Sequence, residues 1–486
     1  MEKKDLKPAG VFKYFEEICQ VPRPSKKEEK MIAYLKAFGA KHNLETKVDE
    51  AGNVLIKKPA TPGKENLQTV VLQSHIDMVC EKNNDVQHDF LTDPIETEID
   101  GEWLKAKGTT LGADNGIGVA TELAILADDS IEHGPLECLF TVDEETGLTG
   151  AFALQEGFMS GDILLNLDSE DEGEIFIGCA GGIDSVAEFT YKEAEVPAGY
   201  FFFKVEVKGL KGGHSGGDIH LGRGNANKIL NRFLSRMAAR HDLYLCEING
   251  GNLRNAIPRE AYTICAVPED AKHDVRTELN IFTSEMEDEL SVVEPDLKLV
   301  LESETPRKTA IDQDTTTRLL KALYAAPHGV YAMSQDIPGL VETSTNLASV
   351  KMKPNHVIRI ETSQRSSILS ARNDMANTVR AVFQLAGANV TFGEGYPGWK
   401  PNPHSAILEV AVESYKRLFG VDAKVKAIHA GLECGLFLDK YPTLDMISFG
   451  PTLTGVHSPD ERMLIPTVEK FWKHLLDILA HVPAKK

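Results

Sequence analysis

The first part of the chain alternates amphipathic stretches with short apolar runs. Residues 8–42 predict two amphipathic helices broken around Pro24, and Ser25 followed by Glu28 resembles a capping box at the start of the second. A helical stretch is also predicted over residues 116–127. Four apolar runs predict strands at residues 54–56, 70–72, 139–142 and 163–165. Because these runs are continuous rather than alternating, they indicate an α/β fold with a mainly parallel sheet covered by flanking helices.

The pattern changes after about residue 186, where strands and helices recur at wider spacing. Strands are predicted at residues 201–207, 261–267, 297–301, 343–349 and 357–362. Helices are predicted at residues 225–239, 275–287, 315–325 and 371–385. A linker rich in Gly and Pro follows at residues 394–398. We therefore expect a discontinuous first domain, residues 1–186 and 396–486, with an α+β domain inserted at 187–395.

Composition limits the classes of function. The 486 residues include 52 Lys and Arg against 73 Asp and Glu, a net charge of -21, which disfavours nucleic acid and anionic membranes as partners. No apolar run approaches the roughly eighteen residues that cross a bilayer, and the N-terminal segment lacks the apolar core of a signal peptide. Seven cysteines without a CxxC pair indicate a reducing compartment, so we expect a cytoplasmic protein.

Residues with metal-binding chemistry follow three of the predicted strands, where each strand ends. A fourth segment, a glycine-rich loop that opens a helix, adds another Asp. These residues are His75, Asp77, Asp114, Asp143, Glu144, Glu145 and Asp168. The carboxyl ends of strands in an open α/β sheet meet at one edge, and imidazole with carboxylate suits Zn²⁺ and related ions.

Each of these residues alone has an ordinary explanation, since an Asp after a strand is usually a turn former or a helix cap. Together, however, they bring many acids to one edge. Carboxylates in one pocket repel one another, so two cations bridged by one carboxylate are expected rather than one.

The motifs resemble a known family. His75-Ile76-Asp77, Asp114-Asn115, Asp143-Glu144-Glu145, Asp168 and Gly455-Val456-His457-Ser458 look like the di-zinc exopeptidases that include carboxypeptidase G, aminoacylase and carnosine-cleaving dipeptidases. Longer stretches at residues 111–118, 212–220 and 429–435 are similar to the aminoacyl-histidine (Xaa-His) dipeptidase branch.

The resemblance implies a metal site with two Zn²⁺, for which Co²⁺ or Mn²⁺ could substitute. Asp114 would bridge the ions, with His75 and Asp168 on one and Glu145 and His457 on the other. The family usually has a cis peptide after the bridging Asp. Here that bond would be the one that follows Asp114.

The resemblance also implies catalytic roles for two acids. Asp77 would hold the His75 ring through a hydrogen bond. Glu144 would be the general base for attack by a metal-bridging hydroxide and would pass the proton to the leaving amine.

In the inserted domain, the resemblance implies a lid that often also forms a dimer interface, so we expect a homodimer. His214 would polarise the scissile carbonyl, while Asn255 and Arg365 would bind the C-terminal carboxylate of a small dipeptide.

The sequence departs from the family pattern at Glu433, which stands where many relatives carry a Gly-Gly-Thr-Asp-like turn. We hypothesise that it meets the free amino group of the substrate, which favours unblocked dipeptides.

Two alternatives stay open at this point. One is an amidohydrolase of the same fold that acts on N-acyl amino acids. The other is a non-catalytic metal-binding or scaffold protein, although every expected ligand position is filled. A metallo-dipeptidase acting on Xaa-His dipeptides, β-alanyl-histidine included, accounts for the motifs best.

Overall fold

The computed structural model describes residues 3–83 and 85–485, and the chain divides into two compact units. The first unit comprises Met1–Cys179, Trp399–Ala427 and Leu432–Lys486, and the second comprises Ala180–Gly398 and Ile428–Gly431. These limits lie a few residues from the boundaries that the sequence predicts. The short piece at residues 428–431, which joins the second unit, has no counterpart in the sequence prediction.

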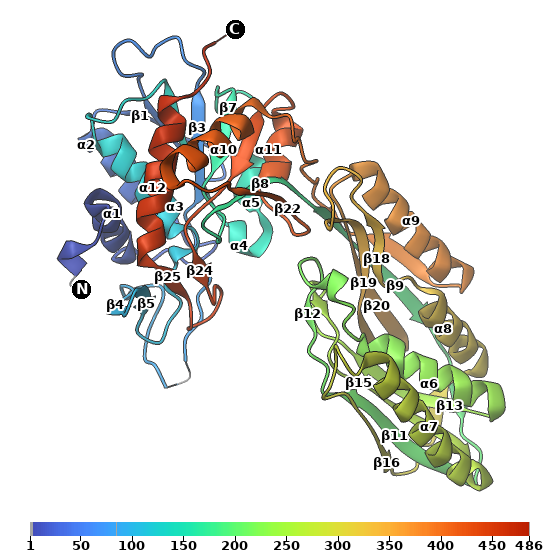
Figure 1. The fold of residues 1–486 in the computed structure, drawn as a ribbon. Helices are drawn as coiled ribbons and strands as arrows, with labels where there is room; N and C mark the ends of the chain where they lie inside the picture. The colour runs from blue at the N-terminus through green and yellow to red at the C-terminus, as the bar shows by residue number, and fades with distance from the viewer. Residues whose placement is uncertain (1–2, 84, 486) are drawn as a thin grey trace. The chain divides into compact units, whose positions relative to one another are not determined.

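An eight-stranded sheet forms the centre of the first unit (Figure 1). Its order is β1 (Glu45–Val48), β2 (Val54–Lys58), β6 (Leu136–Thr141), β3 (Val70–His75), β7 (Ile163–Asn166), β23 (Asp445–Ser448), β8 (Glu174–Cys179) and β22 (Lys424–Ile428). The pairs β6–β3, β3–β7 and β7–β23 are parallel, whereas β1–β2, β2–β6 and β23–β8 are antiparallel. The α/β prediction is confirmed, and its parallel part is the centre of the sheet.

The helices of this unit are α1 (Ala9–Cys19), α2 (Glu29–Lys41), α3 (Ala113–Ala127), the short α4 (Glu144–Gly147) and α5 (Thr149–Ala153), α10 (Ala406–Phe419), α11 (Cys434–Lys440) and α12 (Ile465–Ala480). Helices α2, α3, α10 and α11 pack on the sheet, while α1 packs on α3 and α12 on α10. Helix α3 lies between β3 and α1 and is buried along almost its whole length. A small sheet, in the order β24 (Leu453–Thr454), β25 (Arg462–Leu464), β5 (Trp103–Ala106) and β4 (Thr97–Asp100), completes the unit.

The capping box predicted at the start of α2 is wrong. Glu28 is itself the residue before the helix, and no side-chain bond caps it. The hydroxyl of Ser25 instead donates to the Asp77 carboxylate at 2.7 Å. A local sequence pattern has been overridden by a contact between distant parts of the chain.

The second unit is built on an antiparallel sheet. Its order is β16 (Lys298–Ser303), β11 (Tyr200–Lys208), β15 (Ala261–Pro268), β13 (Tyr244–Gly250), β19 (Val341–Lys353), β20 (Val357–Ser366), β9 (Gly181–Thr190) and β21 (Asn389–Phe392), with β18 (Gly329–Met333) also paired to β19. Short pairs form between β10 (Glu193–Glu195) and β17 (Thr309–Ile311), and between β12 (Gly213–His214) and β14 (Ala256–Ile257).

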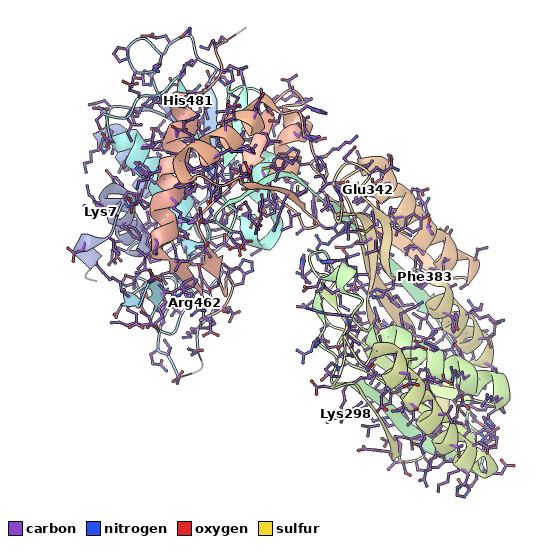
Figure 2. The ribbon with its side chains drawn as sticks, in the orientation of Figure 1. Lys7, Lys298, Glu342, Phe383, Arg462 and His481 are labelled. Carbon is purple, nitrogen blue, oxygen red and sulfur yellow. The ribbon has the colours of Figure 1, made fainter. Side chains whose placement is uncertain are left out.

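Four helices cover one face of this sheet: α6 (Ala226–Arg240), α7 (Lys272–Leu290), α8 (Gln313–Ala325) and α9 (Leu369–Leu385). The core between sheet and helices includes Phe203 of β11, Phe233 of α6 and Phe383 of α9, all fully buried. Phe383 is labelled in Figure 2. Side chains of Asn225 and Asp312 cap α6 and α8. All seven cysteines of the chain are free thiols. Among the described residues, none of the helices combines the length and apolarity needed to span a bilayer.

Candidate metal centre

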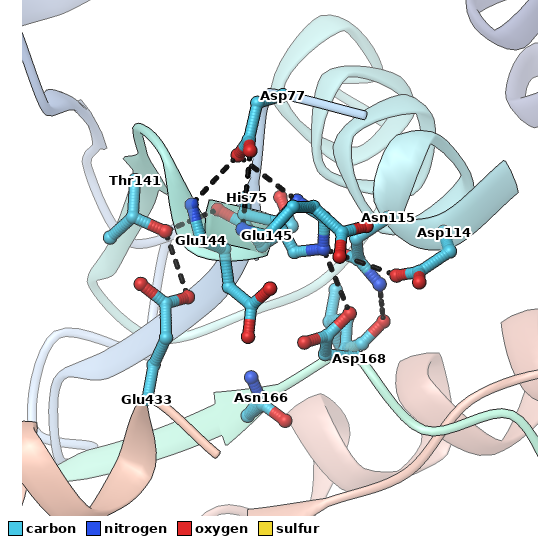
Figure 3. Close-up of polar contacts among 12 residues, drawn as sticks. His75, Asp77, Asp114, Asn115, Thr141, Glu144, Glu145, Asn166, Asp168 and Glu433 are labelled. Atoms are coloured by element: carbon cyan, nitrogen blue, oxygen red, sulfur yellow. Dashed lines mark hydrogen bonds and ion pairs between the residues drawn. The ribbon is translucent and has the colours of Figure 1, made fainter. Parts of the chain in front are cut away.

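His75, the last residue of β3, lies at the centre of a buried polar cluster in the first unit. Its Nε2 atom is 3.1 Å from Asp114 Oδ1 and 3.4 Å from Asp168 Oδ1 (Figure 3). Its Nδ1 atom is 3.3 Å from Asp77 Oδ1. Asp168 follows the neighbouring strand β7, so two adjacent parallel strands deliver these groups to the same edge of the sheet.

Asp114 lies between two imidazoles. Its Oδ1 faces His75, and its Oδ2 is 3.2 Å from Nε2 of His457. The same His457 nitrogen is 2.9 Å from Glu145 Oε2. The cis peptide expected between Asp114 and Asn115 is confirmed. The Asp114 carboxylate therefore has one oxygen on the side of His75 and the other on the side of His457.

The electrostatics of the cluster fit cations. Burial and neighbouring acids raise the pKa of Asp168 to about 7 and that of Glu145 above its ordinary value. The hydrogen bonds to Asp114 and Glu145 raise the pKa of His457 to about 11. Among the described residues, Glu145 Oε1 and Asp168 Oδ1 are buried and accept no hydrogen bond, although His75 Nε2 lies 3.4 Å from Asp168 Oδ1. Two imidazoles and three carboxylates, two of which have such an oxygen, form a ligand set that suits divalent metal ions.

Asp77 connects the His75 ring to the turn after β6. Its Oδ1 accepts a hydrogen bond from the Glu144 backbone N–H at 3.0 Å, and its Oδ2 accepts one from the Glu145 N–H at 3.3 Å. Burial opposes ionisation, but the contacts with His75 and these N–H groups lower the pKa of Asp77 below its ordinary value. An ionised Asp77 thus fixes the orientation of one imidazole and of two neighbouring acids.

Glu144 and Glu433 lie next to the cluster. The Glu144 carboxylate points into the space between Glu433 and Asp168 (Figure 3), and burial raises its pKa well above the ordinary value. Glu433 is buried, and its Oε2 accepts hydrogen bonds from Gln73 at 2.7 Å and Thr141 at 2.9 Å. Its Oε1 has no partner among the described residues, and burial raises the pKa of Glu433 to about 8.

Two buried supports of the cluster were missed by the sequence reasoning. Glu461 accepts hydrogen bonds from the backbone of residues 111–114. Arg23 donates to the carbonyls of Ile76 and Asp77, at 3.2 and 3.0 Å, and to that of Gly112. No motif marks either residue, because both act on backbone atoms of distant segments.

The remaining predicted residues gather in the second unit around Ser215, another residue that was missed. The Ser215 N–H donates to the Asn255 carbonyl at 2.8 Å, and its hydroxyl accepts from Arg365 Nε at 3.3 Å. Pairing of β12 with β14 sets His214 opposite Ala256, the neighbour of Asn255. Arg365 is buried, and its Nη1 donates to the Tyr396 hydroxyl at 2.9 Å. Within the described chain, no carboxylate forms an ion pair with it.

His214 is held in one neutral form. Its Nδ1 accepts hydrogen bonds from the Gly216 and Gly217 N–H groups at 3.3 and 3.0 Å, which leaves the proton on Nε2. Burial and the charge of Arg365 lower the pKa of His214 to about 4. The ring therefore presents an Nε2–H donor at neutral pH.

The structure thus gathers the predicted residues into two groups, one in each unit. The first-unit group consists of His75, Asp77, Asp114, Glu144, Glu145, Asp168, Glu433 and His457. The second-unit group consists of His214, Asn255 and Arg365.

Comparison with known proteins identifies relatives over the whole chain. The model of "Peptidase family M20/M25/M40" matches residues 71–481. The cytosol non-specific dipeptidase of Escherichia coli K12 is 46% identical over 484 residues, covering 100% of both chains. The crystal structure of aminoacylhistidine dipeptidase from Vibrio alginolyticus is 46% identical, covers 100% of this chain and 99% of its own, and superposes with a TM-score of 0.91. A tripeptidase structure from Staphylococcus aureus, at 17% identity, 98% and 99% coverage and a TM-score of 0.58, shares the fold.

Proposed function

The chain belongs to peptidase family M20/M25/M40, and from that premise we propose that it is a metallo-dipeptidase that hydrolyses unblocked dipeptides. Xaa-His dipeptides such as β-alanyl-histidine are included among its substrates. The observation that carries the proposal is the position of Asp114, with each carboxylate oxygen facing a different imidazole. Full-length identity of 46% to two proteins named as dipeptidases supports the same reaction.

We propose that the cluster binds two divalent cations, which are zinc ions for which cobalt or manganese can substitute. His75 and Asp168 would hold one, Glu145 and His457 the other, and Asp114 would be shared. When bound, the cations would acidify water and polarise the scissile carbonyl. The distances of 2.9 to 3.4 Å between these side chains support a common site.

Glu144 would move the proton. Its carboxylate extends from the turn after β6 beside Asp168 and accepts none of the side-chain hydrogen bonds found between described residues, so it is free to take a proton from water and deliver it to the leaving amine. Asp77 would keep the His75 proton on Nδ1, so that Nε2 remains a ligand.

Further residues would orient the substrate. The unpartnered oxygen of Glu433 suits the amino group of an unblocked dipeptide. The buried guanidinium of Arg365 suits the C-terminal carboxylate, since a planar fork pairs bidentately with a carboxylate, and Asn255 would assist it. The Nε2–H of His214 suits the oxygen of the scissile carbonyl as charge develops there.

We also propose a cytoplasmic homodimer that associates through the lid domain, residues 187–395. Strand β18 supports this interface, because its side chains Val330, Tyr331 and Met333 are exposed. Free cysteines and a cytosolic relative support the location.

A panel assay tests the function. Metal-stripped and zinc-restored protein would be given alanyl-histidine, β-alanyl-histidine, dipeptides without histidine, and N-acetyl amino acids. We expect hydrolysis of the free dipeptides only after zinc is restored. Faster hydrolysis of N-acetyl amino acids than of free dipeptides would contradict the proposal and favour the amidohydrolase alternative.

A further inference from the structure

Glu461 is a buried carboxylate that binds four consecutive backbone N–H groups. Its Oε2 accepts from Leu111 at 2.7 Å and Gly112 at 2.9 Å. Its Oε1 accepts from Ala113 at 2.8 Å and Asp114 at 3.2 Å. Only 2% of the residue is exposed, so these bonds are shielded from water. Both oxygens therefore accept two hydrogen bonds each, and the four donors span the end of the loop, Leu111 and Gly112, and the first two residues of α3, Ala113 and Asp114.

The loop is also held from its carbonyl side. Arg23 Nη2 donates to the Gly112 carbonyl, and a Cβ at Gly112 would lie 2.6 Å from that nitrogen. Gly112 has a φ of +67°, a conformation that favours glycine. Two buried side chains of opposite charge thus fix the backbone just before Asp114.

Glu461 belongs to the same segment as His457, which contacts the other Asp114 oxygen. The Ser458 carbonyl accepts a hydrogen bond from the Glu461 N–H at 3.0 Å, which closes a tight turn between them. One segment therefore supplies an imidazole to the cluster and also holds the backbone of the carboxylate that this imidazole contacts.

We propose that Glu461 is a positioning residue that sets the spacing of Asp114 and His457 and thereby the affinity of the site for cations. This inference rests on the proposed metal site. Hydrogen-bond partners behind metal ligands commonly contribute about 10- to 100-fold to metal affinity. Glu461 acts through backbone atoms, so it touches neither cation nor substrate.

The test is zinc binding to the metal-free protein, measured by competition with a chromophoric chelator. In Glu461→Gln, an amide NH₂ replaces one oxygen and faces two N–H donors. We expect its zinc affinity to fall at least about tenfold, with KM for β-alanyl-histidine within about twofold of wild type at saturating zinc.

A matched control is Glu137→Gln. Glu137 is equally buried and accepts hydrogen bonds from the Ser160 N–H and hydroxyl, at the opposite end of β6 from the cluster. It should lose thermal stability but keep wild-type zinc affinity.

The outcomes separate the inference from the proposed function. Wild-type protein that binds no zinc would contradict both. If wild type binds two zinc ions, two results would overturn the inference alone. One is a zinc affinity in Glu461→Gln equal to that of wild type. The other is a loss of zinc affinity in Glu137→Gln as large as the loss in Glu461→Gln. If Glu461→Gln does not fold, Glu461→Asp keeps the charge with a shorter reach, and wild-type zinc affinity in that variant would also overturn the inference.

Discussion

Replacing Glu433 with glutamine tests how the protein selects a free amino group. One oxygen of the carboxylate accepts hydrogen bonds from Gln73 and Thr141, and the other has no partner among the described residues. Because Gln73 and Thr141 both donate, the amide of the substituted side chain must turn its oxygen toward them. Its NH₂ group then occupies the position of the unpartnered oxygen and faces the substrate amino group, donor against donor.

The size of the effect follows from the bond that is lost. A hydrogen bond to a charged group contributes about 1.5–3 kcal/mol net, which corresponds to about a 10- to 100-fold change in kcat/KM. Because Glu433 is 1% exposed, water cannot replace the missing acceptor. We therefore expect the upper part of this range for β-alanyl-histidine.

The assay compares two substrates that differ only in the amino group, β-alanyl-histidine and propanoyl-histidine. Wild type should prefer the first by about 10- to 100-fold in kcat/KM, and Glu433→Gln should reduce that preference to about threefold or less. Glu122→Gln is the control, since Glu122 is another fully buried acid, bonded to the Ser74 hydroxyl at 2.7 Å. It should leave the preference unchanged. An unaltered preference in Glu433→Gln would refute the role of this carboxylate.

Three further predictions concern single groups. Glu144→Gln should bind zinc with near wild-type affinity yet lose at least about 1,000-fold in kcat, and a variant with wild-type kcat would exclude Glu144 as the base. Asp77→Asn should weaken zinc binding by about 10- to 100-fold in a chelator competition, because the His75 ring loses its anionic partner. The His214 ring should titrate near its pKa of about 4 by NMR, so it stays neutral from pH 5 upward, and Arg365→Met should move that pKa upward by removing a nearby positive charge. An ordinary pKa near 6.5 in wild type would contradict the buried neutral ring.

The elements that carry the metal centre could be predicted from the sequence because strand ends are strong signals. Continuous apolar runs marked β3, β6 and β7, and the polar residues directly after each run had to emerge at one edge of the sheet. The family resemblance added His457, which lies 343 residues beyond Asp114 and which no local pattern connects to the strands.

Other features could not be read from the sequence because their partners are distant. Ser25 resembles a helix cap, yet its hydroxyl bonds Asp77. Glu461 and Arg23 look like ordinary charged loop residues, and only the folded backbone brings amides and carbonyls to them. Strand β9 was not predicted, because two glycines open it and Asp184, Ser185 and Glu188 interrupt any continuous apolar run.

In the proposed metal centre, Asp114 bridges two cations. Crystals of the protein soaked in zinc, with diffraction measured on both sides of the zinc absorption edge, show whether it does. We expect two anomalous peaks roughly 3.5–4 Å apart, one near His75 and Asp168 and the other near Glu145 and His457. A single peak, or peaks that do not contact Asp114, would contradict it.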